Sequence, residues 1–372
     1  MWARCDGWSG SSVLDRGEVV GISPALAPRS RVEGNAYRLH ANRDRSFQGS
    51  VVVGMGFVLS PSEAEAMIAT DQRKAGVVRP YLTGEDLNSR PDSSPSRWVI
   101  DFRDWPVERA RTYVDPFTRV EGLVRPDRAK VNREAHRLRW WQFGDKRPAL
   151  YRAIAPLDRC IVITLVSKVV QPMFVPTGIV YAHKLGVFAY EDDAHFGLLS
   201  SAVHWWWAVT RTSTLGVAPN YSPTDAFETF SQPDLTNNAV GEAGGALNDH
   251  RSTLMLARQE GLTKTYNRVH DPEEHGDDIV RLRELHVELD HAVRDAYGWT
   301  DLDLGHGFHE TKFGTRFTFA PAPRQEVLDR LLELNHERYA EEVRQGLRAK
   351  PKAKAGRKGA HAGAMTLGFD GV

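Results

Sequence analysis

The chain has 372 residues, 41% of them hydrophobic and 26% charged, so it is long enough for two domains that each bury an ordinary core. Lys+Arg and Asp+Glu both number 48, so the net charge is zero and the chain as a whole does not attract nucleic acid. Any binding of nucleic acid must therefore depend on a local basic patch. Cys5 and Cys160 form no metal-binding spacing, and no apolar run approaches the roughly 18 residues of a membrane span. With no apolar signal region in its first residues, the chain is predicted to be a reduced, cytoplasmic protein without disulfides or structural zinc.

The N-terminal part is predicted to pass from a connector into a sheet. Residues 1–45, rich in Gly, Ser, Pro and charge, are predicted to connect an upstream domain to this one. The first predicted strand covers 50–59, which is rich in β-branched residues. Ser-Pro-Ser-Glu at 60–63 combines a capping box with a proline at the first helical position, so a short helix is predicted to follow. Another strand is predicted over 97–102.

The stretch 137–148, Arg-Leu-Arg-Trp-Trp-Gln-Phe-Gly-Asp-Lys-Arg-Pro, interleaves basic and aromatic side chains. Between residues 125 and 152 there are nine Lys or Arg and only three acids, which makes a local basic surface in a neutral protein. Cationic side chains bind phosphates and aromatic faces stack on bases or sugars. The stretch therefore predicts a nucleic-acid contact by Arg137, Arg139, Trp140, Trp141, Lys146 and Arg147. The alternative is a basic helix over 126–140 whose aromatic end packs in a core.

The middle of the chain is predicted to be mostly sheet, with strands over 159–166, 171–175 and 179–190. Residues 196–209 are apolar on nearly every side of a helix, which is typical of a helix buried all round. A loop follows and ends at Ser222 and Pro223, which are predicted to cap another helix.

Beyond residue 233 the composition changes to charged, helix-periodic sequence, which predicts a domain boundary near residue 236. Two long helices are predicted from apolar stripes over 279–293 and 327–343, the first ending at Gly298. Residues 308–319 alternate enough to predict a hairpin. Residues 348–372 begin with a basic run without acids and are predicted to form a disordered tail.

Sequence motifs for catalysis are missing. The clusters of His and carboxylates at 284–288 and 306–310 lack the HExxH spacing that places two imidazoles on one helical face, so no metal is predicted. There is neither a G-x-S-x-G elbow nor a P-loop. Asp192 and His195 leave open an unrelated hydrolase as a weaker hypothesis, although their surroundings are typical of a turn between a strand and a helix.

Several motifs in one order resemble the C-terminal half of MmeI-like, type IIL restriction-modification enzymes, over about residues 14–345. The resemblance lies in Ser46-Phe-Gln-Gly-Ser50, Gly54-Met-Gly-Phe-Val-Leu-Ser-Pro61, Arg79-Pro-Tyr-Leu-Thr-Gly-Glu-Asp-Leu-Asn-Ser-Arg90, Ser96-Arg-Trp-Val-Ile-Asp-Phe102, Trp140-Trp-Gln-Phe-Gly-Asp-Lys-Arg-Pro148, Phe196-Gly-Leu-Leu-Ser-Ser201, Gly261-Leu-Thr-Lys-Thr-Tyr-Asn267 and Ala296-Tyr-Gly-Trp299. In that family this region is a target recognition domain followed by a helical domain, behind an adenine-N6 methyltransferase domain that uses S-adenosylmethionine.

The resemblance implies an α+β fold, with a mixed-sheet target recognition domain over 46–235 and a mainly helical domain over 236–347. The chain contains no Asn-Pro pair for the Asn-Pro-Pro-Tyr motif that holds a flipped adenine, and its Pro-Asp pairs have no Glu-x-Lys partner downstream. We therefore expect no catalytic residue and no cofactor in this chain, with S-adenosylmethionine bound by the missing methyltransferase domain.

The expected function is recognition of a sequence in double-stranded DNA for an adenine-N6 methyltransferase or restriction-modification enzyme. Readout of base edges requires polar side chains from strands or loops, and the candidates are Lys168, Lys184, Asn220, Ser222 and Thr224. The alternative is a structural or assembly module that docks on a separate methyltransferase subunit. The first hypothesis predicts sequence-dependent DNA binding, whereas the second predicts weak contact with DNA.

Overall fold

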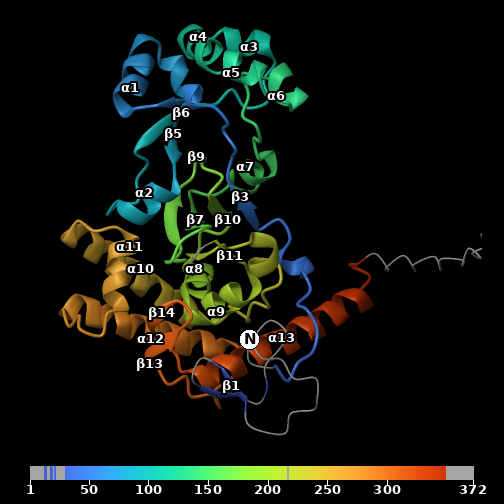
Figure 1. Ribbon diagram of the computed structural model, residues 1–372, viewed down its shortest axis with the longest axis vertical. Helices are drawn as coiled ribbons and strands as arrows, with labels where there is room; N and C mark the ends of the chain where they lie inside the picture. Colours follow the sequence, from blue (N-terminus) through green and yellow to red (C-terminus); the bar gives the residue numbers. More distant parts are fainter. Residues whose placement is uncertain (1–11, 15–16, 20, 22–29, 216–217, 349–372) are drawn as a thin grey trace, which may run out of the picture.

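The computed structural model describes residues 12–14, 17–19, 21, 30–215 and 218–348. Figure 1 shows an elongated molecule with a smaller upper lobe and a larger lower lobe joined by a narrower waist. Apart from Arg348, the predicted tail at 348–372 lies outside the described residues, as does much of the predicted connector at 1–45. Helices and largely antiparallel sheets occupy separate parts of the chain, which confirms the α+β class. Among the described residues, no helix combines the length and the apolar composition needed to cross a membrane.

The upper lobe contains a four-stranded sheet in the order β4-β6-β5-β9. Its strands are β4 (Val58–Leu59), β6 (Arg97–Ile100), β5 (Val78–Leu82) and β9 (Val180–Tyr181). The first three pair antiparallel, whereas β9 pairs parallel to β5. The helices of this lobe are η2 (Met55–Phe57), α1 (Pro61–Thr70), η3 (Gln72–Gly76), α3 (Val107–Arg111), α4 (Val114–Leu123), α5 (Arg125–Ala129) and α6 (Glu134–Leu138).

A second four-stranded sheet, in the order β3-β10-β7-β8, lies below the waist and is antiparallel throughout. Its strands are β3 (Ser46–Gln48), β10 (Leu185–Phe188), β7 (Arg159–Thr164) and β8 (Met173–Pro176). Two short helices, α2 (Gly84–Ser89) and α7 (Pro148–Ile154), contact this sheet, α2 at β7 and α7 at β3. Because β9 and β10 are consecutive, one short segment supplies a strand to each lobe.

The rest of the lower lobe is mainly helical. Its helices are η1 (His40–Asn42), α8 (Asp193–Ser200), α9 (Ala202–Arg211), the π-helix η4 (Pro223–Phe227), α10 (Ala239–Arg258), α11 (Leu262–Val269), α12 (Asp277–Ala296) and α13 (Pro321–Arg344). Three two-stranded hairpins are β1 (Ser12–Leu14) with β2 (Gly17–Val19), β11 (Thr214–Leu215) with β12 (Ala218–Pro219), and β13 (Gly307–Thr311) with β14 (Gly314–Thr318).

The hydrophobic core of the lower lobe crosses residue 236. Leu82, Trp207, Leu289 and Leu331 belong to one continuous buried cluster, so the sheet and the later helices share a core. Helices α8 and α10 approach closely because glycines meet at their contact: a Cβ on Gly197 would lie only 2.7 Å from the carbonyl oxygen of Val240. The predicted boundary near residue 236 therefore marks a change in composition, and the two parts pack as one body.

Residues 30–42 lie along α13 and are attached to it by hydrogen bonds. The Ser30 hydroxyl donates to Asp329 at 2.6 Å, the Tyr37 amide to the side chain of Asn335 at 2.7 Å, and the His40 amide to Glu342 at 2.6 Å. We call residues 30–42 the N-terminal strap. It binds the last described helix to the start of the lower sheet.

Most of the predicted elements with strong local signals are confirmed. Ser60 and Glu63 form the predicted capping box at the start of α1, with the Ser60 amide donating to Glu63 at 2.8 Å. Strands over 97–102 and 159–166, the hairpin over 308–319 and both long C-terminal helices are present. Gly298 has a φ of 74° and follows Tyr297, the C-cap of α12, as a helix-ending glycine should.

Four predicted elements were wrong in extent. The strand over 179–190 is two strands, β9 and β10, which belong to different sheets. The strand over 50–59 is only β4, because Val53 and Gly54 have φ values of 50° and 131° and turn the chain. The helix over 126–140 is two short helices, α5 and α6, separated at a turn whose carbonyls at Val131 and Asn132 accept hydrogen bonds from Arg137. The helix over 196–209 breaks at Ser201, which accepts from the His204 amide and caps α9.

Candidate functional site

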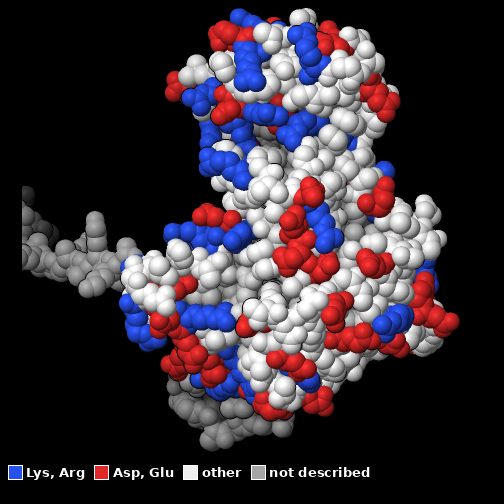
Figure 2. Space-filling model, turned by 180° about the vertical axis from the view of Figure 1, so that it is seen from behind, with Lys and Arg blue, Asp and Glu red and all other residues white. Residues whose placement is uncertain are grey.

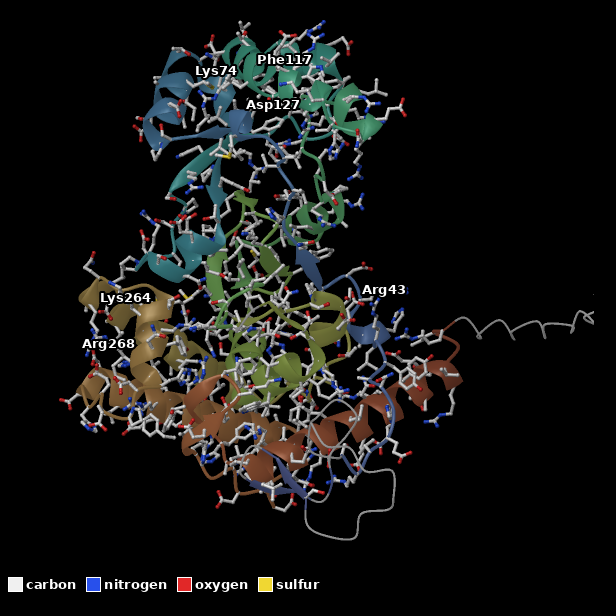
Figure 3. All side chains as sticks on the ribbon, viewed as in Figure 1. Arg43, Lys74, Phe117, Asp127, Lys264 and Arg268 are labelled. Carbon is white, nitrogen blue, oxygen red and sulfur yellow. The ribbon has the colours of Figure 1, made fainter. Side chains whose placement is uncertain are left out.

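A hollow lies between the two lobes on one side of the molecule. In Figure 1 this side is on the right, where α6 of the upper lobe and η1 of the lower lobe project and α7 lies between them. Figure 2, seen from behind, shows Lys and Arg on both sides of this hollow at the left of the view. Figure 3 places Arg43 on this side of the lower lobe and Lys264 on the opposite side. Exposed basic residues of the bordering segments are Arg43, Arg45, Arg133, Arg137, Arg139 and Arg152.

The predicted basic residues of 137–148 differ in exposure and in the hydrogen bonds and ion pairs that their side chains already make. Arg139 is exposed, and within the described residues its side chain makes no ion pair. Arg137 is exposed but donates to the carbonyls of Val131 and Asn132 at 2.7 and 2.9 Å. The Lys146 ammonium donates to Gln142 at 2.8 Å. Of the predicted phosphate contacts in this stretch, Arg139 is therefore the one whose charge has no competing partner among the described residues.

The aromatic part of the same stretch is structural. Trp140 is only 8% exposed, and its ring lies 5.3 Å from that of Phe117 in the core of the upper lobe. Trp141 is half-buried, and its indole donates to the carbonyl of Trp105 at 2.9 Å. The prediction that Trp140 stacks on bases is corrected by its burial, because its faces are already covered. The alternative, an aromatic end that packs in a core, describes it better.

Arg147 connects α7 to the edge strand of the lower sheet. Its guanidinium donates to the Gln48 side chain at 2.9 Å and to the carbonyl of Gly49 at 3.4 Å, and it pairs with Asp145 at 3.2 Å. Arg147 also has a φ of 51°, which is uncommon for a residue with a Cβ. These contacts fix the Arg147 side chain at the waist. It therefore connects α7 to β3 at the border of the hollow and also adds positive charge there.

Three of the predicted base-reading residues meet at one end of the lower sheet. The amide of Leu165 donates to the carbonyl of Lys184 at 2.9 Å, and the amide of Tyr221 donates to the carbonyl of Leu165 at 2.7 Å. Asn220 forms a β-bridge with Val166, two residues before Lys168 in the chain. Lys168 and Lys184 are exposed and Asn220 is half-buried. We call Lys168, Lys184 and Asn220 the sheet-end group.

Ser222 and Thr224, predicted with that group, serve instead in a helix cap. The Ser222 hydroxyl donates to Asp225 at 2.7 Å and accepts from the Asp225 amide at 3.3 Å. It also lies 3.1 Å from the Thr224 hydroxyl. The start of η4 thus occupies both hydroxyls. This confirms the predicted cap at Ser222 and removes most of the hydrogen-bonding capacity that readout of bases would need.

Two polar residues beside Lys184 that the sequence did not single out are Gln48 and His183. The Gln48 amide donates to the carbonyl of His183 at 2.7 Å, beside Lys184. They are neighbours only because β3 pairs with β10 across more than a hundred residues of sequence. The signal available in the sequence was that Gln48 lies inside one of the motifs of the resemblance.

A buried arginine shapes the loop between β3 and β4. Arg128 is 2% exposed and donates to the carbonyls of Val52 at 2.9 Å, Val53 at 2.7 Å and Gln142 at 2.7 Å. Burial lowers the pKa of its guanidinium to about 10. Val53 is held at a positive φ, and the next residue but one, Met55, is 74% exposed. Arg128 therefore has an internal role, although the sequence placed it in the basic surface.

Asp192 and His195, the residues considered for catalysis, form the N-terminal cap of α8. Asp192 accepts from the His195 amide at 2.9 Å and lies 2.8 Å from its imidazole, while the His195 ring stacks on Tyr190 at 3.7 Å. These contacts begin α8 and leave the imidazole covered on one face, which supports the turn interpretation. Within the described ranges, no group of three or more His, Cys, Asp or Glu has the geometry to hold a metal ion.

The comparisons with known proteins bear on this arrangement. The family model described as "MmeI, target recognition domain" matches residues 32–234, more than half of the chain. The chain belongs to this family. A search of curated proteins found no match.

The solved structure of the type IIL restriction-modification enzyme MmeI in complex with DNA is similar in fold, with a TM-score of 0.64 and 18% sequence identity. The match covers 87% of this chain and 39% of that one, so this member of the family spans well under half of the length of its structural relative. It also extends the likeness beyond residue 234 into the helical part of the lower lobe.

Arg128→Met is expected to lower the free energy of unfolding by about 3 kcal/mol, because it leaves the buried carbonyls of Val52 and Gln142, and the part-buried carbonyl of Val53, without this donor. The matched control is Arg125→Met: Arg125 is an exposed neighbour whose ion pair with Glu121 at 2.8 Å should contribute less than about 1 kcal/mol. Urea denaturation followed by tryptophan fluorescence measures both. Equal losses in the two variants would contradict the internal role of Arg128.

Proposed function

We propose that this chain recognises a specific sequence in double-stranded DNA for an adenine-N6 methyltransferase or restriction-modification enzyme. The observation that carries the proposal is the family itself, a target recognition domain, together with a fold shared with an enzyme solved on DNA. The charge and polarity of the hollow provide independent support.

Contact with phosphates is assigned to the basic borders of the hollow. A neutral chain has no long-range attraction for DNA, so the attraction has to come from a region where cations outnumber acids. Arg43 on the lower lobe and Arg139 on the upper lobe are exposed on the two borders. A duplex in the hollow would be contacted from both lobes, and Arg137 would add to this charge.

Readout of bases is assigned to the sheet-end group. Lys donates to the O6 and N7 atoms of guanine, and Asn can pair with adenine through two hydrogen bonds. Lys184 and Asn220 extend from backbone that is held by hydrogen bonds to Leu165 and Ser213, and such rigid placement is what direct readout requires. Lys168 follows two residues after the bridge between Val166 and Asn220, and its carbonyl accepts from Arg316. Gln48, on the neighbouring strand, adds a fourth polar group.

Catalysis is assigned to another polypeptide segment. A methyl transfer to adenine requires a site for S-adenosylmethionine and a pocket that holds the extruded base, and the sequence motifs for both are missing from this chain. We propose that a methyltransferase domain, on a separate chain or joined ahead of this one, supplies the cofactor and the chemistry, and that the protein acts on DNA in the cytoplasm.

A second candidate function is docking on a methyltransferase subunit. The observation that favours it is a set of exposed apolar side chains on the upper lobe, where a partner protein could cover them: Met55, Val114, Leu123 and Leu138, each at least 52% exposed. Strong, salt-dependent DNA binding by the isolated chain favours DNA recognition as its own function. Binding that requires the methyltransferase favours docking.

DNA binding by the chain is expected to weaken steeply with salt. If roughly four phosphates are neutralised, log K against log salt should have a slope of about −3.6. Replacing Arg43 and Arg139 with Gln should flatten this slope to about −1.8, since two phosphate contacts are removed. Fluorescence anisotropy of a labelled duplex over a salt series measures the slope. Lys264→Gln, on the far side of the lower lobe, is the matched control, and an equal change there would reject the hollow as the site.

Lys184→Ala and Asn220→Ala are expected to change which sequence is methylated more than how tightly DNA is bound. Loss of one good base contact costs roughly 1–3 kcal/mol of discrimination at one position. The variants are made in a complete enzyme that carries this recognition region, and its methylated sites are sequenced. Recognition that stays identical at every position in both variants would rule out the sheet-end group as the reader of bases.

Purified residues 1–372 are expected neither to bind S-adenosylmethionine nor to methylate DNA, because the sequence lacks the cofactor loop and the adenine-pocket motif. Calorimetry with S-adenosylmethionine and incorporation of labelled methyl groups into mixed-sequence DNA measure this directly. A complete methyltransferase of the same family serves as the positive control. Saturable cofactor binding by the chain alone would show that it contains a catalytic site.

A further inference from the structure

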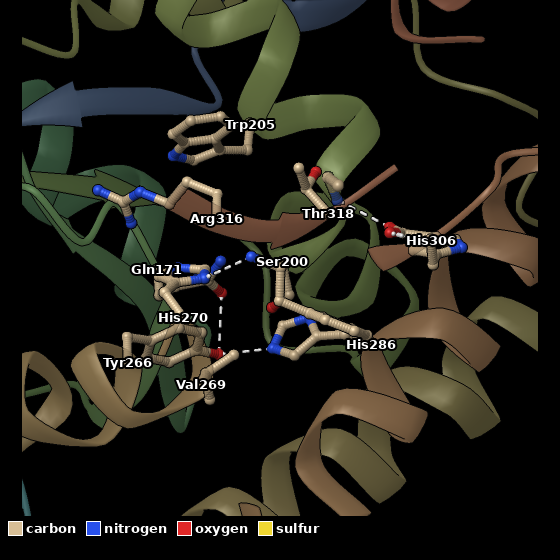
Figure 4. Close-up of a pocket in the computed structure, with 13 residues that line it drawn as sticks. Gln171, Ser200, Trp205, Tyr266, Val269, His270, His286, His306, Arg316 and Thr318 are labelled. Atoms are coloured by element: carbon tan, nitrogen blue, oxygen red, sulfur yellow. Dashed lines mark hydrogen bonds and ion pairs between the residues drawn. The ribbon is translucent and has the colours of Figure 1, made fainter. Parts of the chain in front are cut away.

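A small, partly open cavity lies in the lower lobe, beside Lys168 of the sheet-end group, whose carbonyl accepts from Arg316 in the cavity lining. It has a volume of about 50 Å³ and is bordered by the ends of α8 and α11, by α9 and α12, and by β14. Figure 4 shows Gln171, Tyr266, His286 and Ser200 around one space, with Arg316 and Trp205 above it. One buried water needs only about 10–15 Å³ of such space. The cavity therefore has room for a small molecule or ion.

One polar side chain of this cavity is buried without any hydrogen-bond partner. Ser200 is 1% exposed, and its hydroxyl oxygen is completely buried and unpaired in the fold. Buried hydroxyl groups are almost always hydrogen-bonded, because leaving one unpaired costs roughly 1–3 kcal/mol. Since Ser200 lines the cavity, a bound group in that space would supply the missing partner.

The charge around the cavity is positive. Arg316 is 8% exposed and donates to the carbonyl of Lys168 at 3.1 Å; none of the ion pairs among the described residues includes it. Arg251, fully buried behind Tyr266, donates to the Tyr266 hydroxyl at 3.3 Å and to a backbone carbonyl, and it too pairs with no described acid. The cavity lining thus contains one guanidinium, that of Arg316, and one carboxylate, that of Asp290, with the Arg251 guanidinium buried behind it.

That carboxylate is already satisfied. Asp290 accepts from the amide of Ala202 at 2.7 Å and lies 2.9 Å from the imidazole of His306. It offers little to a further cation, and among the described residues neither Arg316 nor Arg251 pairs with it. An uncompensated buried guanidinium is costly, so the excess positive charge favours an anion in the cavity.

Two histidines of the cavity, His270 and His286, are kept neutral by burial, and Nε2 of His286 is hydrogen-bonded to the Tyr266 hydroxyl at 2.8 Å. Burial lowers the pKa of His270 well below its usual value and that of His286 to about 4. The Phe317 amide donates to Nδ1 of His270 at 3.2 Å, so the ring proton is on Nε2, where no described group accepts it. Together with the Ser200 hydroxyl, the Gln171 amide and Arg316, this makes the lining rich in hydrogen-bond donors.

We infer that this cavity is a binding site for a small tetrahedral oxyanion of the phosphate class, held by the Arg316 guanidinium and the Ser200 hydroxyl. A phosphate group offers several acceptor oxygens, which match donors from β14, α8 and α11, and planar guanidinium groups bind it in fork geometry. Free inorganic phosphate and a backbone phosphate of a nucleic acid share this chemistry. The site does not depend on the DNA-binding role of the hollow.

The test uses the full chain and inorganic phosphate as the probe. Calorimetry is expected to show one saturable site, and the Tm should rise in phosphate relative to chloride at equal ionic strength. Ser200→Ala should weaken phosphate binding roughly tenfold, and Arg316→Met should abolish it, because each removes a donor to the anion. Arg281→Met, an exposed arginine of α12 that pairs with Glu284 and Glu288, is the matched control and should bind as the original chain does.

Ser200→Ala carries the test if Arg316→Met fails to fold, because the Ser200 hydroxyl has no partner in the fold to lose. Absence of saturable phosphate binding, or binding unchanged in Ser200→Ala, overturns the inference. With the site present, a DNA duplex that competes with phosphate identifies a backbone phosphate as its source. A duplex that leaves phosphate binding unchanged identifies a free anion.

Discussion

The architecture depends on the short segment that runs from β9 to β10. Tyr181 ends β9 in the upper sheet, and Leu185 begins β10 in the lower sheet, so the three residues 182–184 carry the chain across the waist. The Tyr181 side chain is fully buried and lies 3.2 Å from the thiol of Cys160 on β7, while its hydroxyl donates to the carbonyl of Pro176 on β8. Its backbone carbonyl accepts from the amide of Ser50 at 2.8 Å.

These contacts hold the two lobes at a fixed separation. Ser50 follows β3, so the lower sheet is held where the chain rises to the upper lobe, and α7 is attached at the same place through Tyr151, whose hydroxyl lies 3.0 Å from that of Ser50. The width of the hollow is set by this buried junction. A ligand that is contacted from both lobes requires a constant distance between them. Here that distance is fixed by closely packed side chains with few alternative positions.

Features with local causes could be predicted from the sequence. The capping box at Ser60, the stop at Gly298 and the apolar stripe of α12 each depend on neighbouring residues, and all are present. Long-range contacts decided the failures. The sequence around Val53 is typical of a strand. The chain nevertheless turns there, because Arg128, 75 residues later, donates a hydrogen bond to the carbonyl oxygen of Val53. No local pattern contains that information.

The same distinction applies to the candidate site. The basic composition of 125–152 was visible in the sequence, but it did not show which charges are used internally. Arg128 and Arg139 are eleven residues apart and look alike in sequence, and only the fold shows that one is buried while the other is exposed. Likewise, Lys184 and Asn220 lie close together because the backbone of Leu165 is hydrogen-bonded to Lys184 on one side and to Tyr221, the residue after Asn220, on the other. No spacing in the sequence predicts this contact.

The N-terminal strap has a consequence for how the protein is made. Ser30 and Tyr37 bind residues of α13 that lie about three hundred positions later in the chain. At a synthesis rate of about 5–20 residues per second, the strap emerges from the ribosome roughly 15–60 s before its partner helix exists. During that interval the core of the lower lobe is incomplete, so the apolar side chains that α13 covers remain exposed. The upper lobe between residues 51 and 145 can form much earlier, and it needs only β9 to be completed.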